Sequence, residues 1–277
     1  MTRGRGEVSR VTAIDDRNRA TWPEAVAEFV DLEGWTDAGE RVALAAAAPL
    51  VRGRPVLDVG AGAGRTASFL RLLTDDYVAV DYTPEMVAAF RRNHPDLEVH
   101  QADARDLSRF PDGRFGFAVF SFNGIDAVAH HERATVLAEL RRVVEPGGWV
   151  LWSTHNLDGP GHREVPWRGR SDGGPLWWRV PRWLARLPRE LPRHRRSWRN
   201  WWANRRFGEE HEGWAVRTSA AHDFGILMHY ASLGAVRAEA AAAGFVDVTV
   251  WDREGRPAVE PSGSHWFQVL ARTPSVA

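Results

Sequence analysis

The feature that most constrains this chain is a fivefold alternation of short apolar segments with segments of helical spacing. The apolar segments are expected to be strands at residues 56–59, 77–81, about 97–100, 115–122 and 149–153. The fourth is almost continuously apolar, which is typical of a parallel strand covered on both faces. Strands that alternate with helices in this way predict a doubly wound parallel sheet.

Further signals extend this pattern at both ends. Asp37, followed three residues later by Glu40, is typical of a capping box that opens an Ala- and Leu-rich helix. Near the end of the chain, a short helix over 235–243 precedes strands over 245–251 and about 265–272. Because these two strands are close in sequence and no helix connects them, we expect them to pair antiparallel. The predicted fold is α/β, with a doubly wound, seven-stranded, mostly parallel sheet and an antiparallel final strand.

Three glycines follow the first strand in the pattern Asp58-Val-Gly60-Ala-Gly62-Ala-Gly64. Glycine lets the backbone approach a ligand where a side chain would collide. A dinucleotide loop usually has the spacing Gly-x-Gly-x-x-Gly, whereas here the third glycine comes one residue early and an acidic residue precedes the first. This spacing favours S-adenosylmethionine over NAD. A tight turn without a ligand is the alternative.

Two carboxylates follow the next strands. Asp81 ends the second strand, where a carboxylate can accept both ribose hydroxyls of a bound nucleoside. Asp103 follows the third strand, where it could meet an adenine amino group. Each residue could instead form a helix cap or a local turn, so their position beside the glycine loop gives them weight.

Four segments resemble, in order, the motifs of class I methyltransferases. They are Val-Leu-Asp-Val-Gly-Ala-Gly-Ala-Gly-Arg-Thr at 56–66, Val-Asp-Tyr-Thr-Pro-Glu-Met-Val at 80–87, Ala-Asp-Ala at 102–104 and Pro-Gly-Gly at 146–148. The resemblance covers about residues 37–153 and resumes from Ala235 to the final strand. It implies S-adenosylmethionine as the methyl donor and S-adenosylhomocysteine as the product.

The resemblance also implies which residues contact the cofactor. The glycine loop with Asp58 would line the methionine half, Asp81 the ribose and Asp103 the adenine edge. Tyr82 and Met86 would cover the adenine faces, and Phe122 with Asn123 would face the methionine moiety and the transferred methyl group. The complete expected set is Asp58, Gly60, Ala61, Gly62, Gly64, Arg65, Asp81, Tyr82, Met86, Asp103, Ala104, Phe122 and Asn123.

Two histidines are candidates for a general base. Methyl transfer is an in-line displacement, and a base helps when the acceptor is a hydroxyl or a protonated amine. His155 lies just past the fifth strand, at the edge where such folds bind ligands, and His222 follows the segment expected to cover that edge. A structural, hydrogen-bonded histidine is the alternative for each. No set of residues has the spacing of a metal site, so no metal is expected.

Residues 156–217 interrupt the pattern with a Trp- and Arg-rich insertion. Seven of the 14 tryptophans lie from Trp167 to Trp202, and from Arg163 to Arg206 the 13 arginines outnumber three acidic residues. The insertion could be a lid over an aromatic, glycosidic or anionic acceptor, a nucleic-acid surface, or a small core or dimer face. The chain then divides into an arm (1–36), a cofactor core (37–155), this insertion and the end of the core (218–277).

The expected function is methyl transfer from S-adenosylmethionine to oxygen or nitrogen of a small molecule. Residues 120–126, 153–156 and 221–224 resemble a bacterial subgroup from biosynthetic gene clusters, although His229 stands where that pattern has tyrosine. This favours a specialised metabolite, glycosylated or aromatic. An RNA methyltransferase, and a protein or cyclase that binds S-adenosylmethionine without transferring methyl, are the alternatives.

Composition limits the binding partners and the cellular location that we expect. The zero formal charge does not favour a nucleic-acid binder, and the absence of cysteine excludes disulfides and Cys-ligated metals. No apolar run approaches the ~18 residues of a membrane span. We expect a cytoplasmic monomer or homodimer.

Overall fold

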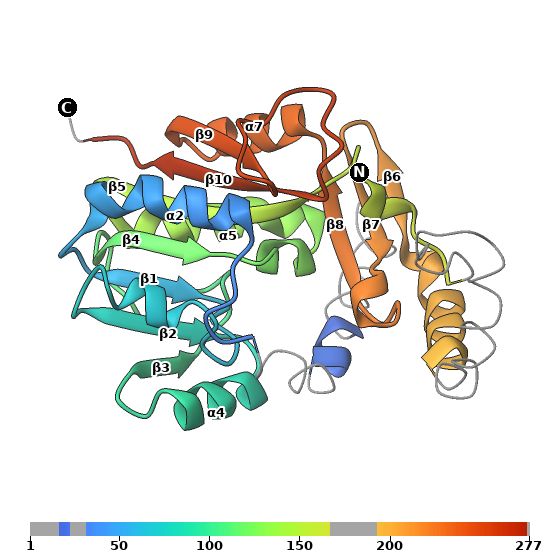
Figure 1. Cartoon of the computed structure of the whole chain (residues 1–277), viewed down its shortest axis with the longest axis horizontal. Coiled ribbons are helices and arrows are strands. Elements are labelled where there is room, and N and C mark those ends of the chain that lie inside the picture. The colour runs from blue at the N-terminus through green and yellow to red at the C-terminus, as the bar shows by residue number, and fades with distance from the viewer. Residues whose placement is uncertain (1–16, 23–31, 167–192, 276–277) are drawn as a thin grey trace, which may run out of the picture.

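The computed structural model describes residues 17–22, 32–166 and 193–275, and these residues form one sheet with helices on both faces (Figure 1). The strands are β1 (Val56–Val59), β2 (Tyr77–Asp81), β3 (Glu98–Gln101), β4 (Phe115–Phe120), β5 (Val144–Asn156), β6 (Glu209–His211), β7 (Trp214–Thr218), β8 (Leu227–Ala231), β9 (Val246–Asp252) and β10 (Trp266–Arg272). Along the sheet the order is β3-β2-β1-β4-β5-β8-β7-β6, and β10 pairs with both β5 and β9.

The predicted fold class is confirmed, with a different number of strands. The order β3-β2-β1-β4-β5-β10-β9 contains the seven predicted strands, and β10 is antiparallel to β5 and β9. The sheet of the described residues has ten strands because β6, β7 and β8 extend it. These three strands were not predicted from the sequence. Glu-Glu-His of β6 lacks an apolar alternation, and all of β7 except Thr218 falls inside the expected insertion.

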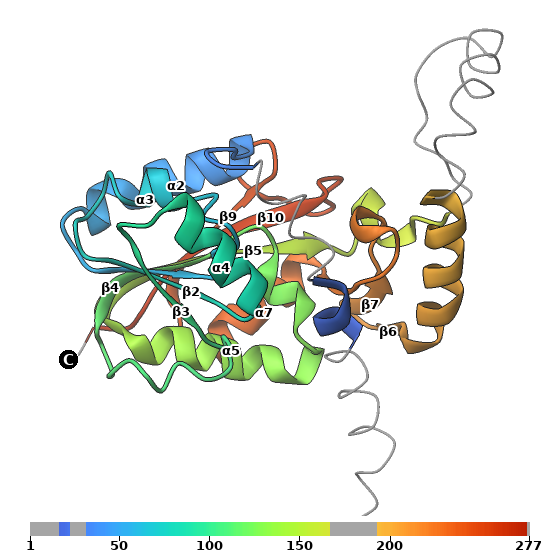
Figure 2. The ribbon, with the colours of Figure 1, turned by 90° about the horizontal axis from the view of Figure 1, so that it is seen from below.

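The helices form two layers (Figure 2). One layer contains α2 (Ala38–Val51), α3 (Ala67–Leu70) and α4 (Pro84–Asn93), and the other contains α5 (His130–Val143) and α7 (Leu233–Ala242). Alternate strand residues point to opposite layers: Val56 and Ala79 pack in the first core, Leu57 and Val78 in the second. Both faces of the strands are therefore buried, which explains their nearly continuous apolar sequences.

The sheet forks along β5, and the fork positions the site. Trp152 pairs with Phe120, the last residue of β4, while three residues further His155 pairs with Tyr230 of β8. β8 thus takes the place of β4 beside β5. The chain after β4 has left the sheet and turned into the short helix η1 (Gly124–Ala127).

A helix at residues 17–22, from the predicted arm, lies against this region (dark blue in Figures 1 and 2). The buried Asn18 amide donates to the carbonyls of Ala127 and Leu227, both at 2.9 Å, and its oxygen accepts from the Leu227 amide at 2.9 Å. All of these groups are paired, so Asn18 ties the arm to η1 and β8.

Parts of the expected insertion are described. Residues 193–204 are helical, and Arg193 and Arg196 donate to Asp223 at 2.7 and 2.9 Å. The short helix η2 (Pro160–Arg163) precedes the undescribed stretch, and the short helix η3 (Arg205–Phe207) precedes β6. Trp167, Trp177, Trp178 and Trp183 lie outside the described residues, so the lid interpretation stays a prediction. None of the described helices is long and apolar enough to cross a membrane.

Candidate active site

A cavity of about 360 Å³ lies at the carboxyl edge of the sheet, beside the fork. One half of its described lining, the glycine-loop half, comes from the segments that follow β1, β2, β3 and β4. The other half, the histidine half, is assembled from distant parts of the chain. It consists of Asn18, Trp22, Ala127, Val128, His155, Ser219, Ala221, His222, Met228 and Trp266.

The structure gives a different reason for glycine at each of positions 60, 62 and 64. Gly60 and Gly62 have φ of +63° and +58°, the left-handed region that disfavours other residues. A Cβ on Gly60 would lie 2.7 Å from the Phe120 ring, whereas one on Gly62 would meet nothing within 4 Å. Gly64 does not line the cavity, because its Cα faces His94, where a Cβ would come within 2.3 Å. Of the three, Gly62 leaves open space for a ligand.

Asp81 holds the glycine loop from the end of β2. Its two carboxylate oxygens accept from the backbone N–H groups of Gly62 and Thr83, at 2.8 and 2.9 Å. Burial raises the pKa of Asp81, and these backbone donors oppose the rise. Each oxygen retains a lone pair, so the carboxylate can accept further hydrogen bonds from the cavity.

The remaining residues expected around adenine also line this half, namely Tyr82, Met86, Asp103 and Ala104. Arg105 donates to Asp103 through Nε at 3.0 Å and Nη2 at 2.6 Å. Burial would raise the pKa of Asp103, but the hydrogen bonds and charge of Arg105 hold it below its ordinary value. The carboxylate is therefore ionised and acts as an acceptor near neutral pH.

Asp58 does not line the cavity, unlike the prediction. Its Oδ2 accepts from Thr66 Oγ1 at 2.7 Å and from the Tyr77 hydroxyl at 2.8 Å, which turns the side chain behind the glycine loop. Burial raises the pKa of Asp58 to about 6, although both hydrogen bonds oppose the rise. Asp58 therefore supports the glycine loop through its contacts with Thr66 and Tyr77.

Arg65 lines the cavity and is anchored by Glu40, which the sequence pattern placed in a capping box. Both oxygens of Glu40 accept from Arg65 at 2.7 Å, and Ser121 Oγ accepts at 2.7 Å. The predicted capping box is therefore only half present. Asp37 accepts from the Glu40 amide at 2.7 Å, but the Glu40 carboxylate pairs with Arg65 because that buried guanidinium needs a counter-charge.

The turn after β4 brings a polar group into the cavity wall. Phe122 and Asn123 have φ of +56° and +61°, which is unusual for residues other than glycine. The backbone N–H of Asn123 donates to Ser153 Oγ at 2.6 Å and fixes this turn against β5. The side-chain Oδ1 of Asn123 is buried and has no hydrogen-bond partner. An unsatisfied acceptor in a cavity wall favours a ligand with a hydrogen-bond donor.

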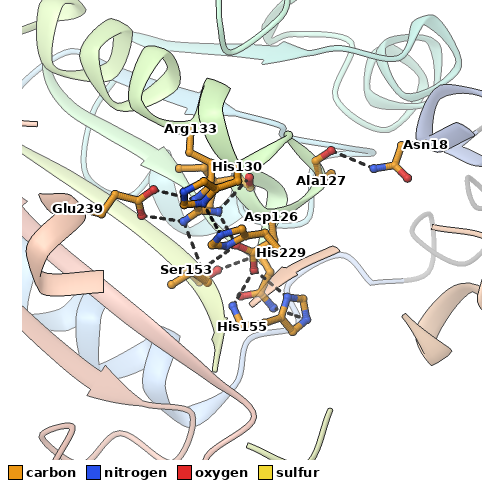
Figure 3. A network of polar contacts seen from close by, with 12 residues as sticks. Asn18, Asp126, Ala127, His130, Arg133, Ser153, His155, His229 and Glu239 are labelled. Carbon is orange, nitrogen blue, oxygen red and sulfur yellow. Dashed lines mark hydrogen bonds and ion pairs between the residues drawn. The ribbon is translucent and has the colours of Figure 1, made fainter. Parts of the chain in front are cut away.

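His155 forms a dyad with Asp126, a residue that the sequence did not single out (Figure 3). Asp126 Oδ2 accepts from the His155 backbone amide at 2.6 Å and from ring Nδ1 at 2.7 Å. Since a carboxylate only accepts, Nδ1 carries a proton, and in the neutral ring Nε2 is the nitrogen with the lone pair. Asn123 Nδ2 lies 3.5 Å from Nε2. The dyad thus presents a ring nitrogen that can take a proton.

His222 also lines the cavity, but in a different setting. It ends η4 (Ala220–His222), and its ring meets Trp22 edge-on at 5.4 Å. The two predicted base candidates therefore share one half of one cavity. Trp22, Met228 and Trp266, which sequence reasoning missed, add apolar surface beside them. Among the described residues, no group of three or more acidic or histidine side chains could hold a metal ion.

Comparisons with known proteins find relatives over part of this chain. Residues 56–148 match the model of a family described as a methyltransferase domain. A demethylmenaquinone methyltransferase of Renibacterium salmoninarum is 36% identical over 112 residues, which are 40% of this chain and 46% of that protein. A probable S-adenosylmethionine-dependent methyltransferase of Mycobacterium tuberculosis is 30% identical over 127 residues, 46% of this chain and 45% of that protein. The chain spans about half the length of the curated relatives it matches.

A solved structure shares the fold over nearly the whole chain. The 1,6-didemethyltoxoflavin-N1-methyltransferase of Burkholderia thailandensis, crystallised with 1,6-didemethyltoxoflavin and S-adenosylhomocysteine, superposes with a TM-score of 0.59 at 17% identity. The superposition covers 96% of this chain and 91% of that one. At this identity the likeness concerns the fold. The family match identifies residues 56–148 as a methyltransferase domain, and the shared fold and the glycine loop agree with the class I, S-adenosylmethionine-dependent type.

Proposed function

We propose that this protein transfers a methyl group from S-adenosylmethionine to an O–H or N–H group of a small molecule, with His155 as the general base. The observation that carries the proposal is the His155–Asp126 dyad, which opens into the same cavity as the glycine loop. Donor and acceptor must share one enclosed space for an in-line displacement, and this cavity supplies both halves.

The glycine-loop half fits the cofactor. Gly62 offers open backbone, Asp81 offers acceptor oxygens for ribose hydroxyls, and the unpartnered Oδ1 of Asn123 fits the amino group of a methionine moiety. When bound, the cofactor supplies a methyl group attached to a sulfonium sulfur, and S-adenosylhomocysteine is the leaving group. Asp103, already ionised, provides an acceptor for an adenine amino group.

The dyad would handle the proton. As the acceptor oxygen or nitrogen bonds to the methyl carbon, its proton passes to Nε2 of His155, and the carbon–sulfur bond breaks with its electron pair on sulfur. Asp126 keeps the ring in the required tautomer and stabilises the imidazolium that forms. The ring then releases its proton to solvent.

The histidine half favours an aromatic acceptor over a glycosylated one. Trp22, Met228 and Trp266 are apolar or aromatic, and the amide of Asn18 is already fully hydrogen-bonded. A sugar would bury several hydroxyls here with few partners, whereas a planar ring would gain contact with the tryptophans. The described lining of this half contains no arginine, so a nucleic-acid acceptor has less support.

The test is turnover. The purified chain would be incubated with S-adenosylmethionine and panels of phenols, heteroaromatic N–H compounds, glycosides and transfer RNA, and S-adenosylhomocysteine would be quantified. We expect product only with small aromatic acceptors. Release with transfer RNA alone would favour the RNA methyltransferase alternative. Cofactor binding with no product from any panel would favour a non-transferring protein.

A further inference from the structure

A buried charged triad of Asp126, Arg133 and Glu239 extends from the dyad into the layer formed by α5 and α7 (Figure 3). Its centre is Arg133 of α5, whose side chain is 0% exposed. Arg133 Nη1 donates to Asp126 Oδ1 at 2.7 Å, and its Nε and Nη2 donate to the two oxygens of Glu239 at 2.7 and 2.8 Å. Glu239 belongs to α7 and does not line the cavity. The triad therefore links a helix outside the site to the partner of His155.

Within the triad, Asp126 has a full set of hydrogen bonds. Oδ1 accepts from Arg133 and from Thr154 Oγ1 at 2.6 Å, while Oδ2 accepts from the backbone and ring of His155. A carboxylate has about four acceptor sites, so Asp126 has little freedom to rotate. Its position therefore depends on the groups that hold it.

Charge balance gives Glu239 a specific role. Without Glu239, the guanidinium of Arg133 would neutralise Asp126 one to one, and the imidazolium of His155 would face a neutral pair. The two hydrogen bonds from Arg133 to Glu239 give the triad a net charge of −1. Solvent screens charges in this interior weakly, so that net charge acts on His155.

The other groups around His155 contribute little charge. Burial, with Arg133 adding to it, holds the pKa of the adjacent His229 well below its ordinary value, and burial raises that of Tyr230 well above. Both rings are therefore neutral near pH 7. Glu164 acts on Tyr230 from an exposed position, where solvent screens it. Trp266, whose ring centroid lies 6.3 Å from that of His155, is uncharged.

We propose that Glu239 is a positioning residue for His155: by sharing Arg133 with Asp126, it leaves Asp126 able to stabilise the protonated imidazole. This inference rests on the proposed function only in giving His155 the role of base. The electrostatic link itself belongs to the folded protein and can be measured without substrate.

The experiment is a histidine titration by NMR on the full-length chain, comparing wild type with Glu239→Gln. Loss of the charge should move the titration midpoint of the His155 ring to lower pH by roughly 0.5–1 unit. The matched control is Glu139→Gln, because Glu139 binds Arg142 through both oxygens and its side chain is equally exposed, at 20%. That control should leave the His155 midpoint unchanged.

A second variant separates charge from shape. Glu239→Asp keeps the charge, so its midpoint should stay near that of wild type, and it serves as the test if Glu239→Gln does not fold. With an active acceptor in hand, the acidic limb of the pH–kcat profile should move with the NMR midpoint. A folded Glu239→Gln chain with an unchanged midpoint, a Glu239→Asp midpoint as low as that expected for Glu239→Gln, or an equal shift in Glu139→Gln, would overturn the inference. These outcomes do not depend on whether any acceptor is methylated.

Discussion

The two halves of the cavity are built in different ways. The glycine-loop half is a series of short segments, each at or after the end of one of four neighbouring strands, β1 to β4. The histidine half combines an arm helix, a turn after β4, the fork of β5 with β8, and the start of β10. Short motifs therefore encode the first half, while tertiary structure assembles the second. One cofactor-binding plan can in this way carry different acceptor sites.

The largest expected effect comes from the histidine half. His155→Ala should lower kcat by roughly 10²–10⁴-fold, because the general base is lost, while the affinity for S-adenosylmethionine stays near that of wild type. His222→Ala should act mainly on KM, since the ring packs against Trp22 within the acceptor side. Steady-state kinetics with an aromatic acceptor would measure both. Comparable kcat values for His155→Ala and wild type would rule out the dyad as the base, whereas partial rescue by added imidazole would support it.

The support beneath the glycine loop should respond to pH. The pKa of Asp58 is about 6 in the folded chain, above its ordinary 3.8, so folding favours the protonated carboxyl. The stabilisation from this group is complete below about pH 4 and is lost as the pH rises through about 6. Relative to Asp58→Asn, the wild type should lose about 3 kcal/mol of unfolding free energy between pH 4 and pH 7. Urea melts of both proteins across this range would measure it, and parallel pH profiles would contradict it.

A smaller effect is expected on the cofactor side. Asp81→Ala should weaken S-adenosylmethionine binding by roughly 1.5–3 kcal/mol, because ribose hydroxyls lose an acceptor and the Gly62 amide loses its partner. Asp81→Asn, which keeps one acceptor oxygen, should lose less. Calorimetry on the folded variants would decide. Unchanged affinity in Asp81→Ala would place the ribose elsewhere.

The same contrast explains what the sequence could predict. The seven core strands, the antiparallel last pair and most of the glycine-loop residues follow from local apolar patterns and spacing. Asp126 could not be predicted in this way, although it follows β4 and His155 lies one residue before the end of the neighbouring β5. Two residues with positive φ, Phe122 and Asn123, lie between β4 and Asp126. Asn tolerates this backbone conformation, but Phe122 gives no sign of it, and the Ser153 hydrogen bond that fixes the turn is a tertiary contact.

Glu40 and the arm helix show a second limit. The Asp37–Glu40 spacing fits a capping box, yet a buried arginine 25 residues later takes the Glu40 carboxylate. A tertiary ion pair won over a local hydrogen bond because an unpaired guanidinium in the interior costs more than an uncapped amide at a helix end. In the same way, Asn18 reaches Leu227 across 209 residues, a contact that no local pattern contains.

The most direct test is calorimetric titration of the wild-type chain with S-adenosylmethionine, S-adenosylhomocysteine and NAD. The structure predicts micromolar binding of the first two with one site per chain, and no measurable heat with NAD. Binding of NAD alone would contradict the assignment of the glycine-loop half, and so would the absence of binding by all three.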